Sequence, residues 1–340
     1  MAVEVEIRDV WVTLSGTPVL RGVSLSASGG RATVVVGPSG SGKTTLLRVA
    51  AGFLQPDRGD VLIDGRSATH LSPQERGAAL LSQRPVLLPH MSVADNIALA
   101  ARLARGLTRG EARRLAAELA ASLGLPGGVL GRKPAELSGG QLQRASLAAV
   151  LAARPRILLL DEPFAHLDLP LREELRRLVA RLSREWGFAL VQVTHDQDEA
   201  LELADSLAVL VDGRIADYGP PERVYWRPST LEAARFLGHN IHCGPPLAPR
   251  GELASAPPEA VSVDPRGQGW IVASIYRQRG RVLVRLRGPG GEGDLQAYVH
   301  PSMARRIEPG ASVGVSVEDW AVRVWGPCRA GWAPRASRQP

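Results

Sequence analysis

The sequence is poor in lysine, cysteine and aromatic residues, and it contains no long hydrophobic run. Only Lys43 and Lys133 are lysines among 41 basic residues, so arginine carries almost all of the positive charge. No apolar stretch approaches the ~18 residues of a membrane span, and we expect no signal peptide at the start of the chain. Cys243 and Cys328 have no metal-type spacing, and we do not expect a disulfide framework from them. These absences favour a cytosolic protein that meets a membrane only through a partner.

Length and composition are those of a globular protein with more than one domain. The chain has 340 residues, of which 44% are hydrophobic and 22% are charged, and this length supports two domains. The net charge of +7 is compatible with a nucleic-acid partner or an anionic membrane surface. A GC-rich genome, which favours arginine and alanine codons, accounts for the same excess, and we prefer that explanation.

The first chemical motif lies between residues 34 and 47. A β-branched run leads into a glycine-rich turn that matches G-x-x-x-x-G-K-[ST], and an apolar helix start follows. Glycines let such a turn present backbone N–H groups to phosphate oxygens, and the helix N-terminus adds its positive dipole end. Lys43 can reach the terminal phosphates, and the Thr44 hydroxyl can ligate Mg²⁺. The flanking strand and helix argue against a chance glycine-rich turn. The candidate phosphate-binding residues are Gly37, Pro38, Ser39, Gly40, Ser41, Gly42, Lys43, Thr44 and Thr45.

Two further motifs stand where an anion or a metal ion could bind. Residues 137–141 read LSGGQ and precede a helix expected over 143–153, so a serine hydroxyl and glycine amides meet at a helix N-terminus. Residues 157–160 predict a central parallel strand buried on both faces. Asp161 and Glu162 fall at its carboxyl end, where the ligands of such sheets bind. The alternative, an acidic pair that caps a helix, leaves the two neighbouring motifs unexplained.

Together these stretches resemble the ATPase subunit of an ATP-binding-cassette (ABC) transporter, a family in which LSGGQ is the signature. The resemblance implies an α/β P-loop NTPase fold with a helical subdomain at about 84–156, and it implies ATP and Mg²⁺ as ligands. It also implies a nucleotide held between two chains. One chain gives the lysine loop, and the other gives Ser138, Gly139, Gly140 and Gln141.

The resemblance also implies roles for single residues. Asp161 resembles the Mg²⁺-associated aspartate, and Glu162 resembles the carboxylate that polarises the attacking water. His195, at the end of an expected buried strand, matches the switch histidine that contacts the γ-phosphate; a structural histidine is the alternative. Gln83 fits the glutamine that approaches the metal and links to the membrane partner. The resemblance thus implies catalytic roles for Glu162, His195 and Gln83, and metal-binding roles for Thr44, Gln83 and Asp161.

Two regions depart from the family pattern. Asp168 matches the loop usually written S-A-L-D, which contributes to nucleotide binding at the dimer contact, but Ala165 and His166 differ from it. Leu14 stands where the family carries an aromatic residue that stacks on adenine, and Trp11 is displaced by three positions. We therefore expect normal phosphate chemistry with weak selection of the base.

The carboxyl-terminal third has a different pattern. Residues 218–228 resemble the segment that closes importer-type cassettes, and prolines between 245 and 258 predict an irregular linker. Short alternating β segments then recur from 260 to 324, a spacing typical of a small barrel. This part resembles the oligonucleotide/oligosaccharide-fold (TOBE) accessory domain of importers for iron(III), polyamines, sulfate or molybdate. We expect an ATP-binding domain at 1–238 and an all-β TOBE-like domain at 239–340.

Three residues near the domain boundary look like metal ligands. His239, His242 and Cys243 are close in sequence, but no second cluster stands at a suitable spacing. We expect structural roles for them.

The sequence predicts the cytosolic ATPase of a solute importer, peripheral on the inner face of the cell membrane. We expect it to pair with a second ATPase chain, as a homodimer or with a related subunit, and to dock on two transmembrane permease subunits. The apolar, proline-held stretch 84–89 is the predicted permease contact. An extracytoplasmic solute-binding protein would act indirectly, and the sequence does not identify the solute.

Two alternatives remain. A soluble ABC ATPase that acts on nucleic acid or ribosomes usually carries two cassettes or a long coiled-coil insert, and this sequence shows one cassette and no such heptads, so we expect no nucleic-acid partner. An exporter ATPase would not need a carboxyl-terminal barrel, and fused exporters carry membrane spans. Binding of nucleic acid would favour the first alternative, and co-purification with a permease and a solute-binding protein would exclude the second.

Overall fold

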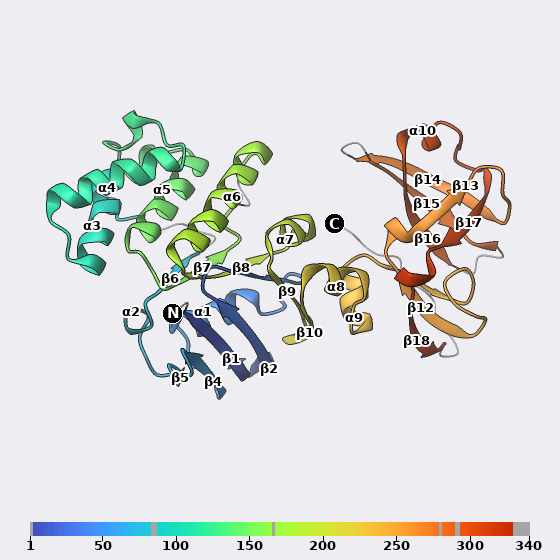
Figure 1. Cartoon of the computed structure of the whole chain (residues 1–340), viewed down its shortest axis with the longest axis horizontal. Helices are drawn as coiled ribbons and strands as arrows, with labels where there is room; N and C mark the ends of the chain where they lie inside the picture. Colours follow the sequence, from blue (N-terminus) through green and yellow to red (C-terminus); the bar gives the residue numbers. More distant parts are fainter. Residues whose placement is uncertain (1–2, 83–86, 165–166, 279–280, 290–292, 329–340) are drawn as a thin grey trace. The chain divides into compact units, whose positions relative to one another are not determined.

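The computed structural model shows a chain that divides into two compact units, residues 1–221 and residues 222–340 (Figure 1). The structure describes residues 3–82, 87–164, 167–278, 281–289 and 293–328. The division at 221 precedes the boundary expected at 238, and the assignment of functional domains stays a prediction. Within the described ranges, no helix is both long enough and apolar enough to cross a membrane.

The centre of unit 1 is a six-stranded sheet. Its strands are β3 (Ala32–Val36), β6 (Ala78–Leu81), β7 (Ile157–Asp161), β8 (Ala189–Thr194), β9 (Ser206–Val211) and β10 (Arg214–Gly219). They lie in the order β10-β9-β3-β8-β7-β6, all parallel except β10. Every residue of β3, β7 and β8 is buried, as a parallel sheet covered on both faces requires.

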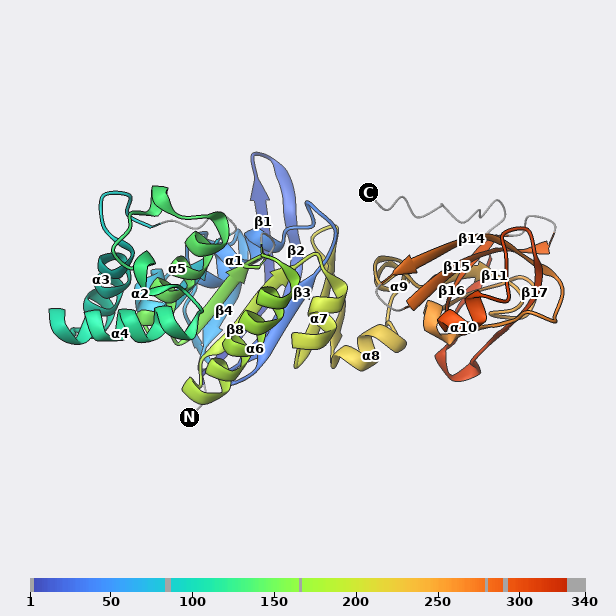
Figure 2. The same ribbon diagram turned by 90° about the horizontal axis from the view of Figure 1, so that it is seen from above.

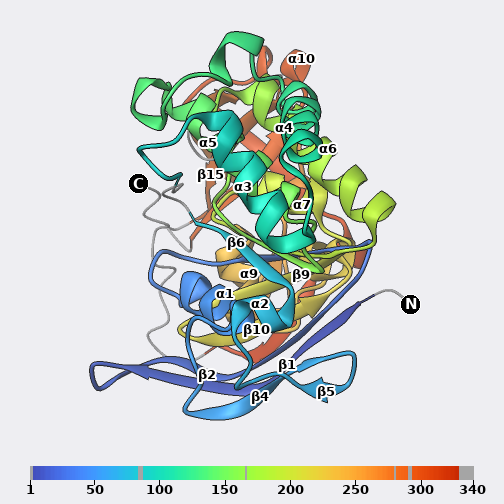
Figure 3. The ribbon, with the colours of Figure 1, turned by 90° about the vertical axis from the view of Figure 1, so that its left-hand side faces the viewer.

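A second, antiparallel sheet belongs to the same unit. It is formed by β1 (Glu4–Leu14), β2 (Thr17–Ser28), β4 (Arg58–Ile63) and β5 (Arg66–Ser67), in the order β2-β1-β4-β5. Helix α1 (Lys43–Ala51) lies between the two sheets (Figure 3). The two sheets and the helix share one hydrophobic core, which contains Val23 of β2, Leu46 of α1 and Val191 of β8. The β1–β2 hairpin projects from unit 1 (Figure 2).

The region expected to be helical forms a separate cluster of helices (Figure 1). It contains α3 (Val93–Arg105), α4 (Arg109–Ser122) and α5 (Gly139–Ala152), and the short helix α2 (Pro73–Arg76) precedes it in the chain. The first two helices are separated by a short turn: Gly106 ends α3 with a φ of 65°, and Thr108 begins α4 with a capping box to Glu111. Helices α6 (Leu169–Trp186) and α7 (Gln197–Leu203) pack on the central sheet.

Unit 2 is mainly β-structure with its own core. Short helices α8 (Pro221–Trp226), α9 (Leu231–Phe236) and α10 (Pro301–Ala304) accompany two antiparallel sheets. One sheet is β11 (Asn240–Cys243), β12 (Glu252–Ala256) and β18 (Arg323–Pro327). The other has the order β13-β17-β14-β15-β16, formed by β13 (Val261–Asp264), β14 (Trp270–Gln278), β15 (Arg281–Arg287), β16 (Asp294–Val299) and β17 (Ser312–Val317). The larger sheet curls until its outer strands β13 and β16 lie against each other, which agrees with the expected small barrel.

Two expectations about unit 2 were wrong. The segment expected to be an irregular linker contains β12 and follows β11, because its prolines fall in the turns around these strands. Cys243 and Cys328 form a disulfide, with Cα atoms 6.2 Å apart. The 85-residue separation gave no local signal for this pair. Pairing of β12 with both β11 and β18 brings the two cysteines to the same end of one sheet.

Candidate nucleotide-binding site

The glycine-rich turn joins the end of β3 to the start of α1. A Cβ atom on Gly37 would lie 2.0 Å from the carbonyl oxygen of Leu210, so no larger residue fits there. Gly42 caps α1 with a φ of 104°, a left-handed conformation that glycine adopts without strain. Close packing and a positive φ therefore fix two of the motif's glycines. The first amides of α1 are left facing the turn, as an anion site requires.

Lys43 lies at the centre of this turn. Its side chain is buried, and Nζ donates hydrogen bonds to the carbonyl oxygens of Gly37 at 2.7 Å and Pro38 at 2.9 Å. Burial lowers the pKa of the Lys43 ammonium, while the carboxylates of Glu162 and Asp161 oppose that shift. The ammonium is thus held beside two carboxylates in a partly dehydrated site.

Thr44 and Asp161 bring hard oxygen ligands together. The Thr44 hydroxyl donates to Oδ2 of Asp161 at 2.9 Å, which connects the first turn of α1 to the end of β7. Burial raises the pKa of Asp161, and the hydrogen bond from Thr44 acts in the opposite direction. Ser41 Oγ, in the same turn, is buried without a hydrogen-bond partner among the described residues. A hydroxyl beside a carboxylate is a donor set that suits Mg²⁺, and the orphaned Ser41 hydroxyl suits an additional polar ligand, so these residues fit a magnesium-bound phosphate.

Glu162 and His195 meet at the carboxyl ends of neighbouring strands. Strands β7 and β8 pair in parallel with Asp161 opposite Val193, and the Glu162 amide donates to the Val193 carbonyl at 3.1 Å. Oε1 of Glu162 lies 3.1 Å from Nδ1 of His195. Glu162 has a φ of 46°, a left-handed conformation that costs a non-glycine residue about 1 kcal/mol. Such strain is typical of residues whose direction is set by function.

The LSGGQ motif forms the start of α5. Ser138 Oγ accepts from the Gln141 amide at 3.3 Å, and Gln141 Oε1 accepts from the Ser138 amide at 3.1 Å, so the two residues form a capping box. Ser138 and Gly139 are exposed. A Cβ atom on Gly140 would lie 3.0 Å from the side chain of Leu167. The motif is therefore a preformed helix N-terminus on the surface, next to the segment that precedes α6.

The structure does not bring all of the sequence-predicted residues together. Hydrogen bonds and electrostatic interactions connect the turn, Asp161, Glu162 and His195 into one site, whereas Ser138 to Gln141 form a second cluster at the start of α5. Asp168 is exposed at the N-cap of α6, and its side chain makes no capping hydrogen bond. The remaining positions, Gln83, Ala165 and His166, lie outside the described residues.

The adenine-stacking position is also on the surface. Leu14 is the last residue of β1 and is 39% exposed. Trp11 is engaged elsewhere: its Nε1 donates to Asp9 at 2.9 Å, and the Arg214 guanidinium lies 5.8 Å from its ring centre. These contacts agree with the interpretation that Trp11 does not replace the missing aromatic residue.

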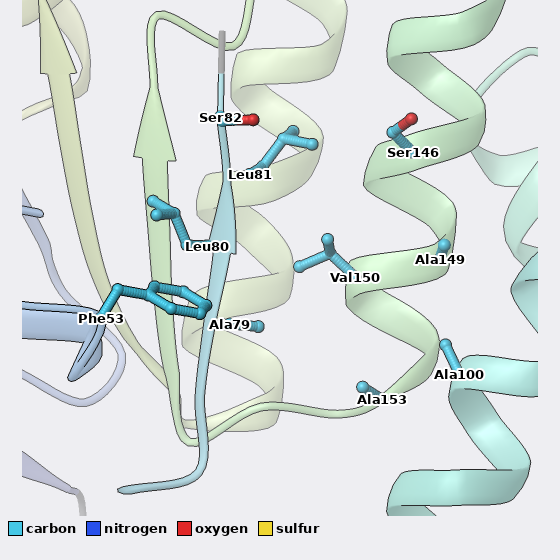
Figure 4. Close-up of a pocket in the computed structure, with 10 residues that line it drawn as sticks. All are labelled: Phe53, Ala79, Leu80, Leu81, Ser82, Ala100, Ser146, Ala149, Val150 and Ala153. Carbon is cyan, nitrogen blue, oxygen red and sulfur yellow. The ribbon is translucent and has the colours of Figure 1, made fainter. Parts of the chain in front are cut away.

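Sequence reasoning missed an apolar pocket beside the expected glutamine loop. It has a volume of about 450 Å³ and lies between β6 and α5 (Figure 4). Figure 4 shows Phe53, Leu81 and Val150 among the side chains around it, with Ser82 at its edge. Phe53 is 63% exposed. A large apolar residue directly after α1 was the available signal for this surface, but single exposed apolar residues are common.

Comparison with known proteins identifies the family. The family model for the ABC transporter matches residues 20–165. The Fe(3+) ions import ATP-binding protein FbpC of Mesorhizobium japonicum is 40% identical over 292 residues, which cover 85% of this chain and 79% of the relative. The sulfate/thiosulfate import ATP-binding protein CysA of Brucella melitensis is 44% identical over 239 residues, which cover 70% of this chain and 67% of the relative.

The fold agrees with that family. A dimeric ATP-binding cassette in a post-hydrolysis state with ADP and Pi matches with a TM-score of 0.59 and 29% identity, over 64% of this chain and 98% of the cassette. The sn-glycerol-3-phosphate import ATP-binding protein UgpC 1 of Rhizobium johnstonii is 43% identical, but this chain spans only 63% of its length. The motifs, the fold and these relatives agree, and the chain belongs to the ABC transporter family, with import ATP-binding proteins as its relatives.

Proposed function

We propose that this chain is the ATP-hydrolysing subunit of an ABC importer, which couples the binding and hydrolysis of Mg-ATP to solute uptake through membrane permease subunits. The observation that carries the proposal is a connected set of residues at the carboxyl ends of β3, β7 and β8, namely Lys43, Thr44, Asp161, Glu162 and His195. The import ATP-binding relatives support the transport direction.

Each member of this set has a chemical task. The amides of the turn and the Lys43 ammonium bind the phosphates, and Thr44 and Asp161 are the residues that would hold Mg²⁺, which neutralises phosphate charge when bound. Glu162, with 19% of its side chain exposed, reaches solvent beyond Asp161 and can accept a proton from water at a carboxylate oxygen. Its contact with Nδ1 orients the His195 ring and leaves Nε2 for the γ-phosphate.

The exposed motif residues support a shared site. Ser138 and Gly139 face solvent, and the exposed Asp168 side chain makes no capping hydrogen bond to the described start of α6. An exposed helix N-terminus binds anions well. We infer that a second ATPase chain places its LSGGQ motif over the nucleotide on this chain. The dimeric cassette with ADP and Pi is a structural precedent for that arrangement.

The apolar pocket supports docking to a permease. Its lining by Phe53, Leu81 and Val150 offers a small apolar surface that ends at Ser82, the residue before Gln83. We propose that a helix of each permease subunit binds there and in the stretch 84–89, which would place the chain at the inner face of the cell membrane. A solute-binding protein would act through the permease alone, and unit 2 would be the TOBE-like accessory domain.

The test is the substitution Glu162→Gln. It keeps the shape of the side chain but removes the base, so we expect turnover to fall by ~10²–10⁴ while ATP still binds. The variant should then elute as an ATP-dependent dimer in size-exclusion chromatography. A Glu162→Gln protein that hydrolyses ATP at the wild-type rate would overturn the catalytic assignment. Co-purification with a permease tests the importer role separately, and filter binding of nucleic acid at physiological salt tests the soluble alternative.

A further inference from the structure

A buried polar network lies directly behind His195. Glu199, on α7, is 5% exposed, and both of its carboxylate oxygens accept hydrogen bonds from β8. Gln192 Nε2 donates to Oε1 at 2.7 Å, and Thr194 Oγ1 donates to Oε2 at 2.8 Å. Gln192 and Thr194 are two positions apart on β8, so their side chains point to the same side of the strand. The Glu199 carboxylate thus binds both of them just before His195.

The same network fixes the chain after His195. Asp196 caps α7, because its Oδ1 accepts from the Glu199 amide at 3.1 Å. The Asp196 amide donates to Thr194 Oγ1, also at 3.1 Å. His195 therefore stands between two residues that both bond directly to Glu199. Its own side chain is 63% exposed and contacts Glu162.

Helix α6 approaches this network with two arginines one turn apart. Arg176 is 6% exposed, and its Nε lies 3.6 Å from Oε1 of Glu199. Arg172 Nη1 lies 3.6 Å from Oδ2 of Asp196, and its Nη2 donates to the Leu167 carbonyl at 3.2 Å. Helix α6 begins directly after Asp168. It therefore contacts both the Asp168 segment, defined here as Leu167 and Asp168, and the loop that carries His195.

Burial of this pair needs a reason other than stability. Removing a carboxylate and a guanidinium from water is unfavourable, and well-packed apolar residues often stabilise a fold equally well. The hydrogen bonds that the Glu199 carboxylate accepts from Gln192 and Thr194 do, however, fix the direction and distance of the groups that they join, and Arg176 adds an ion pair at 3.6 Å. The network surrounds the one loop of β8 and α7 whose geometry decides where His195 points.

We propose that Glu199 is a positioning residue for His195, and that Arg176 and Arg172 link that position to the Asp168 segment through α6. The inference rests on the proposed function, in which His195 acts on the γ-phosphate. Glu199 does not reach the reacting atoms; it holds Thr194 and Asp196 so that the imidazole meets Glu162. A change at the Asp168 segment would move α6 and, through the two arginines, the His195 loop.

The first experiment compares Glu199→Gln with Glu173→Gln in the full chain. Glu173 lies on α6, the helix that carries Arg176, and pairs with Arg177 at 3.4 Å on the helix surface, so it is a control for the loss of an ion-paired carboxylate away from the network. We expect Glu199→Gln to lower kcat by ~10 to 10²-fold, because a catalytic group misplaced by about 1 Å loses that much. The KM for ATP should change less than ~2-fold, and the control should change neither value. An unchanged kcat in folded Glu199→Gln protein overturns the inference.

A double substitution covers the case in which Glu199→Gln does not fold. Glu199→Gln leaves Arg176 buried with only the exposed Glu202, 3.5 Å from its Nη1, as a charge partner. Arg176→Met with Glu199→Gln removes both buried charges and avoids that penalty. We expect the double variant to retain a cooperative thermal transition and to show the same loss of kcat. A folded double variant with wild-type kcat overturns the proposal.

A mutant cycle with His195→Ala separates this inference from the proposed function. If Glu199 acts through His195, then adding Glu199→Gln to His195→Ala should lower the single-turnover rate less than ~2-fold further. A full multiplicative loss overturns the positioning role and leaves the proposed role of His195 intact. Wild-type turnover by His195→Ala alone overturns both, because His195 would then have no catalytic role to position.

Discussion

The two units of the chain use charge in different ways. Unit 1 has 25 basic and 24 acidic residues, whereas unit 2 has 16 arginines, no lysine and 10 acidic residues, so unit 2 carries +6 of the net charge of +7. Arginines of unit 2 stack on aromatic rings: Arg281 lies 5.8 Å from the ring centre of Tyr298, and Arg285 lies 5.6 Å from that of Tyr276. The basic excess of the sequence is therefore concentrated in the unit without the nucleotide motifs.

Unit 1 shows how little net charge the chemistry needs. Its candidate site depends on Lys43, Asp161 and Glu162, which influence one another's environment within one partly buried cluster. Charges in such a place act strongly because water screens them weakly. The placement of a few charges, and not their total, therefore indicates the functional site. If this holds, nucleotide chemistry and partner contacts belong to unit 1, and substitutions in the two units should have different effects.

The largest expected effect comes from breaking the shared site within unit 1. Lys43→Ala removes phosphate binding, and Ser138→Arg places a bulky cation at the exposed start of α5, so each variant alone should lose ATPase activity and ATP-dependent dimerisation. Mixed together, the two variants form hybrid pairs with one intact site, because each site uses one residue from each chain. We expect the mixture to regain partial ATPase activity. No recovery, with each variant folded and able to form mixed pairs, would show that the site lies within one chain.

The next effect concerns the permease contact. Asn96 holds the Leu88 backbone, accepting from its amide at 2.7 Å and donating to its carbonyl at 3.2 Å, while the Leu88 side chain is 41% exposed. Leu88→Glu should therefore abolish transport in a reconstituted system and leave basal ATPase activity intact. Leu103→Glu, at a 79% exposed position on α3, is the matched control and should leave both activities unchanged. Loss of basal ATPase activity in folded Leu88→Glu protein would contradict a docking role.

A smaller effect distinguishes unit 2 by its stability at low pH. Burial lowers the pKa of His239 from its ordinary 6.5 to about 4, although Nε2 donates to the Tyr225 carbonyl at 2.6 Å. Between pH 6.5 and pH 4, His239 is protonated in the unfolded chain but neutral in the folded chain. The free energy of unfolding is therefore highest above pH 6.5 and decreases as the pH falls towards 4. The loss should reach about 3 kcal/mol.

Tryptophan fluorescence is a suitable measurement for that effect, because five of the seven tryptophans lie in unit 2. Urea unfolding of the full chain should show the fluorescence transition weakening between pH 6.5 and pH 4. In His239→Gln, which keeps a donor but does not titrate, this dependence should be reduced. An equal pH dependence in wild type and His239→Gln would exclude His239 as the cause.

The smallest effect returns to unit 1. Leu14 cannot stack on a base as an aromatic ring does, so we expect weak discrimination between ATP and GTP. Leu14→Tyr should tighten ATP binding by up to roughly tenfold, about 1.4 kcal/mol. Calorimetric titration of both proteins with both nucleotides measures this. Strong ATP preference in wild type together with no gain in Leu14→Tyr would mean that another residue binds the base.

The sequence by itself determined the parts of the protein that depend on neighbouring residues. The turn that holds Lys43 is local, because a strand, three glycines and a helix start within 14 residues specify it. The apolar runs that form β7 and β8 could be predicted as buried strands for the same reason. That prediction placed Asp161 and His195 at the ends of the two strands. The break between α3 and α4 is equally local, because Gly106 ends one helix and Thr108 caps the next.

Only the tertiary structure decided the contacts between residues that are far apart in the sequence, because these contacts depend on which helices and strands become neighbours. Glu162 meets His195, 33 positions away, because β7 pairs with β8. Glu199 reads as one acidic residue in a polar helix start until α6 brings Arg176 against it. Cys243 and Cys328 form a disulfide because β12 pairs with both β11 and β18 and so brings the two cysteines together. Strand order and helix packing arise from the burial of apolar surface across the whole chain, so no short stretch of sequence contains them.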